Sequence, residues 1–532
     1  MARKPAFWLR QVRQQIARLP NLRMGRVPDA PALPVRDPWP GDPARGALLL
    51  KGELEFSGAA VALRPGAFAV AAGSTAMRAH THGFAWVRDL RALGTDAARM
   101  RARALVQDWI AAPAHDPVAG RPDVAGARLA SWLGHYDFFA ASADDGFRQK
   151  LMARLVGDAR SLAALLPAEE LDGRALTALK GLFAAAVALP EHPNFLTRAM
   201  KALPQELSRQ VLGDGSHCER SPAMLMAALQ DLTEIRALLQ AAQIVAPPAL
   251  ATAIERMAPA LRTLRHGDGG LSLFNGSKES DPMLVDLVLN QAGRTGRPPA
   301  SLTEGGFQRL QAGRTVLIID CGAPAPAKLD RVAHAGTLGF ELSVGRDRMV
   351  VNVGAAPAAG NEWRDATRAT AAHSTLAIAD TNSSELKPDG LGRRPEQVEV
   401  QRQEANGAHW LEVSHDGYRR AFGAIHRRRL YVAESGDDIR GEDVVEAATP
   451  QPYVIRFHLH PEVNATLQQD GEAVLLRLPG GSGWRLRADG AALTLEESLY
   501  LGGPEPRRCE QVVLTGLQDG PQHVKWAITK LG

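Results

Sequence analysis

The stretch that decides the fold runs from Ala333 to Glu385. It reads AHAGTLGFELSVGRDRMVVNVG at 333–354 and, after a short gap, WRDATRATAAHSTLAIADTNSSE at 363–385. Apolar and polar residues alternate in LGFELSV, MVVNVG and STLAIAD, which predicts three short β-strands. His334 and His373 lie at the edges of these strands, with arginines between them. A β-surface lined by arginine and histidine in this way is suited to an acidic ligand.

The rest of residues 267–532 consists of short apolar runs separated by glycine, aspartate and proline, such as TVLIID, HWLEVSHDGY and YVIRFHLHP. This spacing predicts a large antiparallel β-sandwich rather than a parallel sheet. In VIRFHLH the alternation places Ile455, Phe457 and Leu459 on the face opposite to His458.

Residues 82–266 have a different pattern, in which Ala- and Leu-rich segments carry apolar residues at helical spacing and are separated by proline or glycine. Roughly seven or eight successive helices with short connections predict antiparallel helix pairs. Before them, residues 46–81 predict a small hairpin, and residues 1–45 predict an N-terminal helix followed by a proline-rich connector. The predicted fold is a multidomain α+β protein with an N-terminal (α/α) toroid-like helical domain followed by the β-sandwich.

The composition is that of a globular protein: 532 residues, 45% hydrophobic and 23% charged, with a net charge of +4. This mild basic excess suits an anionic substrate, although a solvated arginine surface is the simpler explanation and the one we favour. No basic run with interleaved aromatic residues indicates nucleic-acid binding. No apolar run approaches the roughly 18–20 residues of a membrane span.

The cysteines and the N-terminus bear on the compartment. Cys218, Cys321 and Cys509 are sparse and odd in number, which predicts free thiols and a reducing environment. Residues 1–20 are basic but lack the apolar core of a signal peptide, and they predict a short amphipathic helix. The expected location is therefore the cytoplasm.

Several segments together carry a resemblance to a known family. They are HGFAWVRDLRALG (82–94), DGSHCERSP (214–222), LRHGDGGLSLFNG (264–276), GGFQRLQAG (305–313), HAGTLGFELSVGRDRMVVNVG (334–354), RATAAHSTLAIAD (368–380), HDGY (415–418) and RFHLHP (456–461). With the order of the two predicted domains, they resemble the heparinase II/III-like polysaccharide lyases. Because related lyases are mostly periplasmic or envelope-associated, the resemblance implies that location as an alternative.

The resemblance implies β-elimination on a uronic-acid-containing glycan. In this reaction a base removes the proton beside the carboxylate, and the 4-linked sugar oxygen leaves. The catalytic candidates are His217 with Glu219, and His334 with His373. The alternatives are structural: Glu219 closing a capping box onto Ser216, and hydrogen-bonded histidines at the second pair.

The candidates for binding an acidic oligo- or polysaccharide are aromatic or cationic. Trp86 is a candidate for stacking on a sugar ring and Arg88 for pairing with a carboxylate. The alternative reading places Trp86 in the core and pairs Arg88 with Asp89. The remaining substrate-binding candidates are Arg220, His266, Arg309 and Arg368.

A divalent metal, zinc, is implied by the resemblance with an incomplete ligand set. The family pattern of His, Asp and His falls on His334, Asn352 and His373, and an amide is a poor zinc ligand. The other departures from the family pattern are Met224 in place of Tyr, Leu225 in place of His, Val332 in place of His, and Gly336 in place of Asp.

Three functions follow from these observations. The first is a lyase in which His217 or His334 transfers the proton. The second is a catalytically impaired protein that keeps the lyase fold and acts as an acidic-glycan-binding or scaffold protein. The third is a glycoside hydrolase, for which Asp89, Asp214 and Glu219 would have to supply two carboxylates about 5–10 Å apart.

Overall fold

The chain forms two compact units, and each is built from several separate segments of the sequence. The computed structural model describes residues 27–112, 116–166, 172–293, 296–447, 449–468, 471–518 and 522–532. Unit 1 comprises the described residues up to Arg209 together with Ala228–Ile254 and Pro357–Gly360. Unit 2 comprises Gln210–Ala227, Glu255–Ala356 and Asn361–Gly532. Within the described ranges, no helix is both long enough and apolar enough to cross a bilayer.

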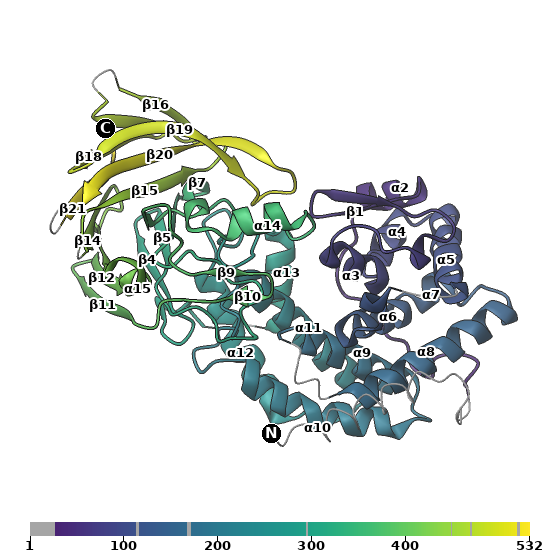
Figure 1. Cartoon of the computed structure of the whole chain (residues 1–532). Helices are drawn as coiled ribbons and strands as arrows, with labels where there is room; N and C mark the ends of the chain where they lie inside the picture. Colours follow the sequence, from purple (N-terminus) through teal and green to yellow (C-terminus); the bar gives the residue numbers. More distant parts are fainter. Residues whose placement is uncertain are drawn as a thin grey trace. The chain divides into compact units, whose positions relative to one another are not determined.

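Unit 1 is helical apart from one small hairpin (Figure 1). Side-chain caps begin several helices, since Asp42, Thr95 and Asp144 each accept a backbone N–H from the first turn of the helix that follows. The elements are α2 (Pro43–Leu50), β1 (Glu53–Phe56), β2 (Ala59–Ala62), α3 (Thr75–Gly83), α4 (Val87–Leu93), α5 (Asp96–Ala111), α6 (Pro122–Gly134), α7 (Tyr136–Phe139), α8 (Asp145–Leu165), α9 (Ala175–Ala188), α10 (Pro193–Gln210), most of α11 (Pro222–Ala241) and the start of α12 (Pro248–Thr263).

Helices α6 and α9 approach each other closely in the centre of unit 1. A Cβ atom added at Gly181 would lie 2.2 Å from the carbonyl oxygen of Gly126. Only glycine at these two positions allows the backbones to come so near, which explains two glycines inside otherwise Ala- and Leu-rich helices.

Unit 2 contains two large antiparallel sheets and a small two-stranded one formed by β9 (Leu386–Lys387) and β10 (Gly390–Leu391) (Figure 1). One sheet has the order β11-β12-β13-β14-β21-β18-β17-β16, and the other has the order β19-β20-β15-β7-β6-β5-β4-β3, with β8 also paired to β15. The strands are β3 (Ser301–Leu302), β4 (Phe307–Ala312), β5 (Thr315–Asp320), β6 (Phe340–Val344), β7 (Asp347–Val351), β8 (Leu376–Ile378), β11 (Val398–Ala405), β12 (Ala408–His415), β13 (Ile425–Val432), β14 (Asp438–Glu446), β15 (Gln451–Leu459), β16 (Asn464–Leu467), β17 (Ala473–Arg477), β18 (Gly483–Asp489), β19 (Ala492–Tyr500), β20 (Arg507–Gln518) and β21 (Gln522–Lys530).

The core of unit 2 combines apolar packing with a buried ion pair. Phe340 stacks on Trp526, with ring centroids 5.6 Å apart and an interplanar angle of 3°. Next to them, Arg428 Nε and His426 Nε2 each lie 2.7 Å from Asp443 Oδ1. Trp526 Nε1 donates to the other oxygen of the same carboxylate at 2.9 Å. Asp443 is therefore ionised in the core and fully hydrogen-bonded.

The predicted fold class is confirmed, including the hairpin around Ser57-Gly58 and the predicted strands of the sandwich. Ile455, Phe457 and Leu459 are fully buried, as their alternation indicated. Three helices depart from the predicted pattern: α2 extends into the predicted hairpin region as far as Leu50, and helices α13 (Pro282–Ala292) and α14 (Asn361–Arg368) interrupt the predicted β-region. The predicted N-terminal amphipathic helix lies outside the described residues, and the predicted linear domain boundaries stay a prediction.

The ion pair in the sandwich core predicts acid sensitivity. Burial alone would raise the pKa of Asp443, but Arg428 and His426 lower it well below its ordinary value. The carboxylate then stabilises the fold fully above its ordinary pKa of about 4 and loses this contribution as the pH falls. We expect Asp443→Asn to lower the free energy of unfolding at pH 7 by about 3–5 kcal/mol and to flatten its decline in acid. Urea denaturation between pH 7 and pH 3 measures both effects, with the exposed Asp437→Asn as the control. Equal pH profiles for wild type and Asp443→Asn would contradict this assignment.

Candidate functional site

His334 and His373 form a hydrogen-bonded pair in unit 2. The backbone N–H of Gly276 donates to His334 Nε2 at 2.9 Å, so the proton of His334 lies on Nδ1. His334 Nδ1 is 3.0 Å from His373 Nε2, and His373 Nδ1 is 2.8 Å from the carbonyl oxygen of Ala369. A carbonyl only accepts, so His373 also carries its proton on Nδ1. All four ring nitrogens are thus engaged in one consistent set of hydrogen bonds.

This arrangement keeps both imidazoles neutral. Burial, followed by the nearby His373 and Arg368, lowers the pKa of His334 well below its ordinary value. Burial also lowers the pKa of His373. A second proton on His373 would point at the N–H of His334, which explains why the pair resists charging.

The donor set does not fit the zinc that the resemblance implied. The lone pairs of His334 and His373 are taken by N–H donors, and Asn352 is equally committed. Its Oδ1 accepts the N–H of Ser374 at 3.0 Å, and its Nδ2 donates to Glu341 at 3.0 Å. Among the described residues, no three or more His, Cys, Asp or Glu side chains gather to hold a metal ion.

Gly336 stands where the family has an aspartate, and the His373 ring occupies the space that a side chain at this position would need. A Cβ atom at Gly336 would lie 2.5 Å from Cδ2 of the His373 ring. An aspartate at this position and the observed orientation of His373 therefore exclude each other.

His217, Glu219 and Arg220 form a turn just before α11. His217 Nε2 is 3.2 Å from Gln210 Oε1, and the N–H of Glu219 donates to His217 Nδ1 at 3.3 Å. Arg220 has a left-handed backbone with a φ of 54°, an unfavourable conformation for a residue other than glycine. The turn is thus held by its own histidine, and no capping box from Glu219 onto Ser216 is needed to explain it.

Asn275 connects this turn to the histidine pair. Its Nδ2 donates to the carbonyl oxygen of Arg220 at 2.9 Å, and its Oδ1 accepts the N–H of His334 at 3.0 Å. The four catalytic candidates are therefore connected through Asn275 and the backbone beside it. However, none of the four exposes more than 4% of its surface, so they do not line an open groove.

The substrate-binding candidates of unit 2 have structural partners instead. His266 lies between Ser343 Oγ and Glu341 Oε2, each at 2.9 Å, and Arg309 donates to the carbonyl oxygens of Thr263 and Arg265. Burial and Arg265 lower the pKa of Arg309 to about 10. Arg220 and Arg368 are buried, and their guanidinium groups donate to backbone carbonyls and to Asp320 and Asp365 respectively.

These contacts correct the interpretation of Arg220 and Arg368 as sugar-binding groups. A buried guanidinium that already donates to carbonyls and a carboxylate has little capacity left for a sugar carboxylate. Asp214 is likewise committed, because it accepts the backbone N–H groups of Ser216, Glu304 and Gly305. This weakens the hydrolase alternative.

The candidates of unit 1 have separate surroundings. Trp86 is buried, donates its Nε1 proton to the carbonyl oxygen of Thr81 at 3.1 Å, and packs on Phe84. Its interpretation as a sugar-stacking residue is wrong for this reason, and the alternative core reading holds. Arg88 pairs with Asp37 at 2.8 Å rather than with Asp89.

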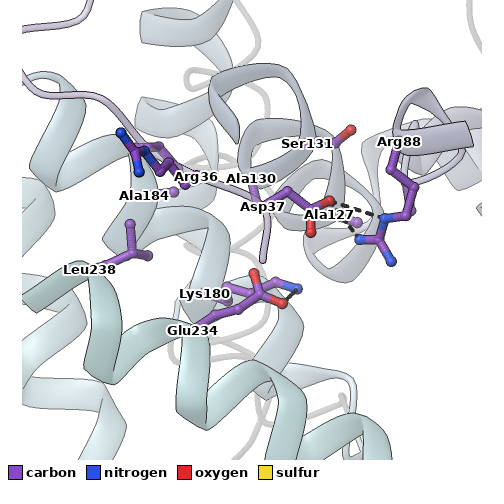
Figure 2. A pocket seen from close by; sticks show the side chains of 12 residues that line it. Arg36, Asp37, Arg88, Ala127, Ala130, Ser131, Lys180, Ala184, Glu234 and Leu238 are labelled. Atoms are coloured by element: carbon purple, nitrogen blue, oxygen red, sulfur yellow. Dashed lines mark hydrogen bonds and ion pairs between the residues drawn. The ribbon is translucent and has the colours of Figure 1, made fainter. Parts of the chain in front are cut away.

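Arg88 lines a small cavity in unit 1, shown in Figure 2. On its floor Lys180 lies 2.7 Å from Asp231 and 3.1 Å from Glu234. Trp39 Nε1 donates to Glu234, which attaches the proline-rich connector to the helices. The cavity has a volume of about 40 Å³, enough for a few water molecules but not for a sugar ring.

Sequence reasoning missed the residues at the centre of the network, Asn275, Asp320 and Glu341. Glu341 accepts the N–H groups of Leu273 and Asn352 on one oxygen and faces His266 with the other. The available signal was its place in FELSV, a strand whose five residues are all buried, so that a charged residue there needs several partners.

Comparisons with known proteins agree with this fold. The family model for the heparinase II/III N-terminus matches residues 105–294, and the model for the heparinase II/III-like C-terminal domain matches residues 294–527. The chain is also 31% identical over 520 residues to FtsZ-localized protein C of Caulobacter vibrioides, covering 93% of this chain and 89% of that protein. The chain belongs to the heparinase II/III-like family.

Solved structures of the heparinase II/III-like family share the architecture. The crystal structure of heparinase III has a TM-score of 0.75 and 14% identity, and the match covers 99% of this chain and 90% of the other. A mutant of heparan sulfate lyase HepC from Pedobacter heparinus has a TM-score of 0.62 and 15% identity over 99% of this chain and 88% of the other. At this level of identity the likeness establishes the polysaccharide-lyase fold alone.

The contact at Gly336 predicts a coupled pair of substitutions. We expect Gly336→Ala to destabilise unit 2 by about 1–3 kcal/mol, because the new methyl group overlaps the His373 ring. In a His373→Ala background the same change should cost much less, because the ring is gone. Chemical denaturation of the two single variants and the double variant gives the coupling free energy. Additive effects of the two substitutions would contradict the contact.

The neutral histidine pair predicts an unusual titration. Because burial lowers the pKa of both rings, we expect His334 and His373 to gain a second proton only at a lower pH than the histidines of the unfolded chain. Long-range nitrogen–proton NMR spectra of histidine-labelled protein, assigned with His334→Gln and His373→Gln, should show both rings as neutral Nδ1–H tautomers at pH 7. The urea-unfolded chain provides the control, since its histidines titrate near pH 6.5. A charged ring at pH 6 in the folded protein would refute the proton assignment.

Proposed function

We propose that this protein is a non-catalytic member of the heparinase II/III-like family that serves as a scaffold in an assembly containing FtsZ. The observation that carries the proposal is the hydrogen bond between His334 Nδ1 and His373 Nε2 at 3.0 Å, with every other ring nitrogen of the pair also engaged. The site supports a fixed structural element better than a group that exchanges protons with a substrate.

β-Elimination requires a base with an available lone pair at the proton beside the sugar carboxylate. The lone pair of His334 accepts from Gly276, and that of His373 accepts from His334. In His217 the Nδ1 atom accepts from Glu219, while Nε2 faces Gln210. Each imidazole would have to break a buried hydrogen bond before acting as a base, which opposes catalysis.

The residues predicted for the general acid and for the group that neutralises the sugar carboxylate are also unsuited to these roles. Met224 occupies the position of the family tyrosine, and a thioether transfers no proton. Arg220 and Arg368 are buried and donate to protein acceptors. The chemistry of uronate cleavage needs these groups together, so their commitment elsewhere supports a non-catalytic role.

The association with FtsZ is suggested by the curated relative whose name describes it as FtsZ-localized, which aligns along 93% of this chain. A relationship along the whole chain, rather than over one domain, favours a shared role of the whole protein. We also propose the cytoplasmic location expected from the sequence, with the periplasm or cell envelope as the alternative.

Two assays on the purified full chain test the proposal. We expect no ultraviolet-absorbing unsaturated product from heparan sulfate, hyaluronan, chondroitin or alginate, because removal of acid–base groups alone costs about 10²–10⁴-fold in rate. An active heparinase serves as the positive control. We expect co-sedimentation with polymers of FtsZ from the source organism, and none with FtsZ held unpolymerised.

The second candidate, a uronan lyase with His217 as the base, is favoured by family membership. It predicts an unsaturated product that disappears in His217→Ala but persists in the exposed His523→Ala. That result would overturn the non-catalytic proposal. Absence of this protein from the pellet of FtsZ polymers, together with absence of lyase product, would contradict the scaffold proposal and leave acidic-glycan binding, measured by calorimetry, as the remaining function.

A further inference from the structure

The outward face of the eight-stranded sheet in unit 2 has a composition unlike an ordinary solvated surface. Register pairs align Trp410, Tyr431, Arg440, Ala527 and Arg487 in one row across strands β12, β13, β14, β21 and β18. The Trp410 and Tyr431 rings lie 5.2 Å apart, and Trp410 is 41% exposed. Trp, Tyr and Arg are the residue types that dominate the energetics of protein interfaces.

The row borders an open hollow of about 790 Å³. Ala527 lies between two strands that carry Arg440 and Arg487 at the register positions on either side. The small side chain leaves space between the two guanidinium groups, whose strands are about 10 Å apart. This spacing can receive a carboxylate from above without moving the sheet.

The charges around the hollow favour an acidic partner. Its lining includes four cations, Arg429, Arg440, Arg487 and Lys525, but only two carboxylates. Arg429 and Arg440 already pair with acidic side chains on the same face. For Arg487 and Lys525, no ion-pair partner is found within the described part of the chain. Lys525 lies in register between Glu442 and Asp489, so Arg487 carries the positive charge that is most available to a ligand.

A neighbouring hollow of about 670 Å³ extends the surface to the edge of the sheet. It shares Trp410 and Arg429 with the first hollow and reaches Gln401 and Gln403 of β11. Its lining also includes the carboxylates Glu404 and Glu412, which pair with Arg402 and Arg429 respectively. Strand β11 is at the end of the sheet order, so one of its two backbone edges is not paired with another strand of that sheet (Figure 1). An extended polypeptide can hydrogen-bond to such an edge, whereas a polysaccharide cannot continue the ladder.

We propose that this face, from the edge of β11 across Trp410 and Tyr431 to Arg487 and Lys525, is a docking surface for an acidic, extended segment of a partner protein. The aromatic pair anchors an apolar side chain, and Arg487, with Lys525 on the neighbouring strand, binds carboxylates beyond it. This surface lies entirely within unit 2 and shares none of its residues with the buried histidine network. The inference names the chemistry of the partner and rests on the proposed scaffold role.

A synthetic probe tests the surface directly. The probe is a fluorescein-labelled peptide of glycine and glutamate with one central phenylalanine, compared with the same peptide carrying glutamine for glutamate. By fluorescence polarisation we expect the acidic peptide to bind at least about tenfold more tightly, and its Kd to rise several-fold when salt goes from 0.05 to 0.5 M. Equal binding of the two peptides, or no binding of either, would overturn the proposal.

Three variants locate the binding. Trp410→Ala and the double variant Arg487→Ser with Lys525→Ser should each weaken the acidic peptide at least about fivefold. Arg477→Ser removes an exposed cation from the same face outside the hollow and should change the Kd by less than about twofold. Circular dichroism melting curves verify that each variant is folded. Equal weakening by Arg477→Ser would indicate a diffuse charge effect and refute the site.

Two further measurements separate this inference from its alternatives. Hyaluronan oligosaccharides that bind more tightly than the acidic peptide, and lose binding in Trp410→Ala, would identify a glycan surface and overturn the peptide proposal. Wild-type co-sedimentation with FtsZ without any peptide binding would refute this surface while leaving the scaffold role intact. Peptide binding without co-sedimentation would support the surface and refute FtsZ as the partner.

Discussion

The hydrogen bond between His334 and His373 is the interaction on which the functional interpretation depends. An imidazole has one donor and one acceptor when neutral, so two rings in contact can satisfy each other only if their tautomers match. Gly276 and Ala369 determine those tautomers from the two outer ends. The pair is consequently complete without substrate or metal. Buried polar groups whose donors and acceptors are all hydrogen-bonded stabilise a fold. Groups that act on a ligand must instead keep a donor or an acceptor free for it.

Two buried carboxylates hold this pair from opposite sides. Glu341 accepts from Asn352, whose side-chain oxygen accepts the backbone N–H of Ser374 at 3.0 Å. Asp443 binds Arg428, which donates to the carbonyl oxygen of the same Ser374 at 3.0 Å. Both backbone groups of the residue following His373 are thus fixed. The position of the imidazole is therefore determined by ion pairs and amides of the sandwich core.

The sequence predicted those strands whose buried face carries only apolar side chains. Strand β15 has a strictly apolar inner face and was found, whereas β14 was not recognised because its inner face includes Gly441 and Asp443. Gly441 is there to accommodate the Trp526 ring, which lies within 2.1 Å of where its Cβ atom would be. Residue types in the candidate site were also predicted. Their hydrogen-bond partners are distant in sequence, such as Gly276 for His334. The sequence alone therefore could not predict that the hydrogen-bonding atoms of these side chains are all engaged, or that the side chains are buried.

The two faces of the sheet that runs from β11 to β16 differ in how many of their polar and aromatic side chains are free to contact a partner. On the inner face His426, Arg428 and Asp443 are fully engaged with one another and with buried neighbours, such as Trp526 and the Ser374 carbonyl oxygen. On the outer face Glu412, Arg429 and Glu442 form an alternating ladder, which neutralises that part of the surface. The ladder does not extend to Arg487, and Trp410 remains exposed to water. A surface that balances most of its charges but leaves an aromatic ring and a cation uncompensated pays a solvation cost that a partner can recover. The binding surface that we propose therefore lies on the outside of the sheet and not at the buried histidine pair.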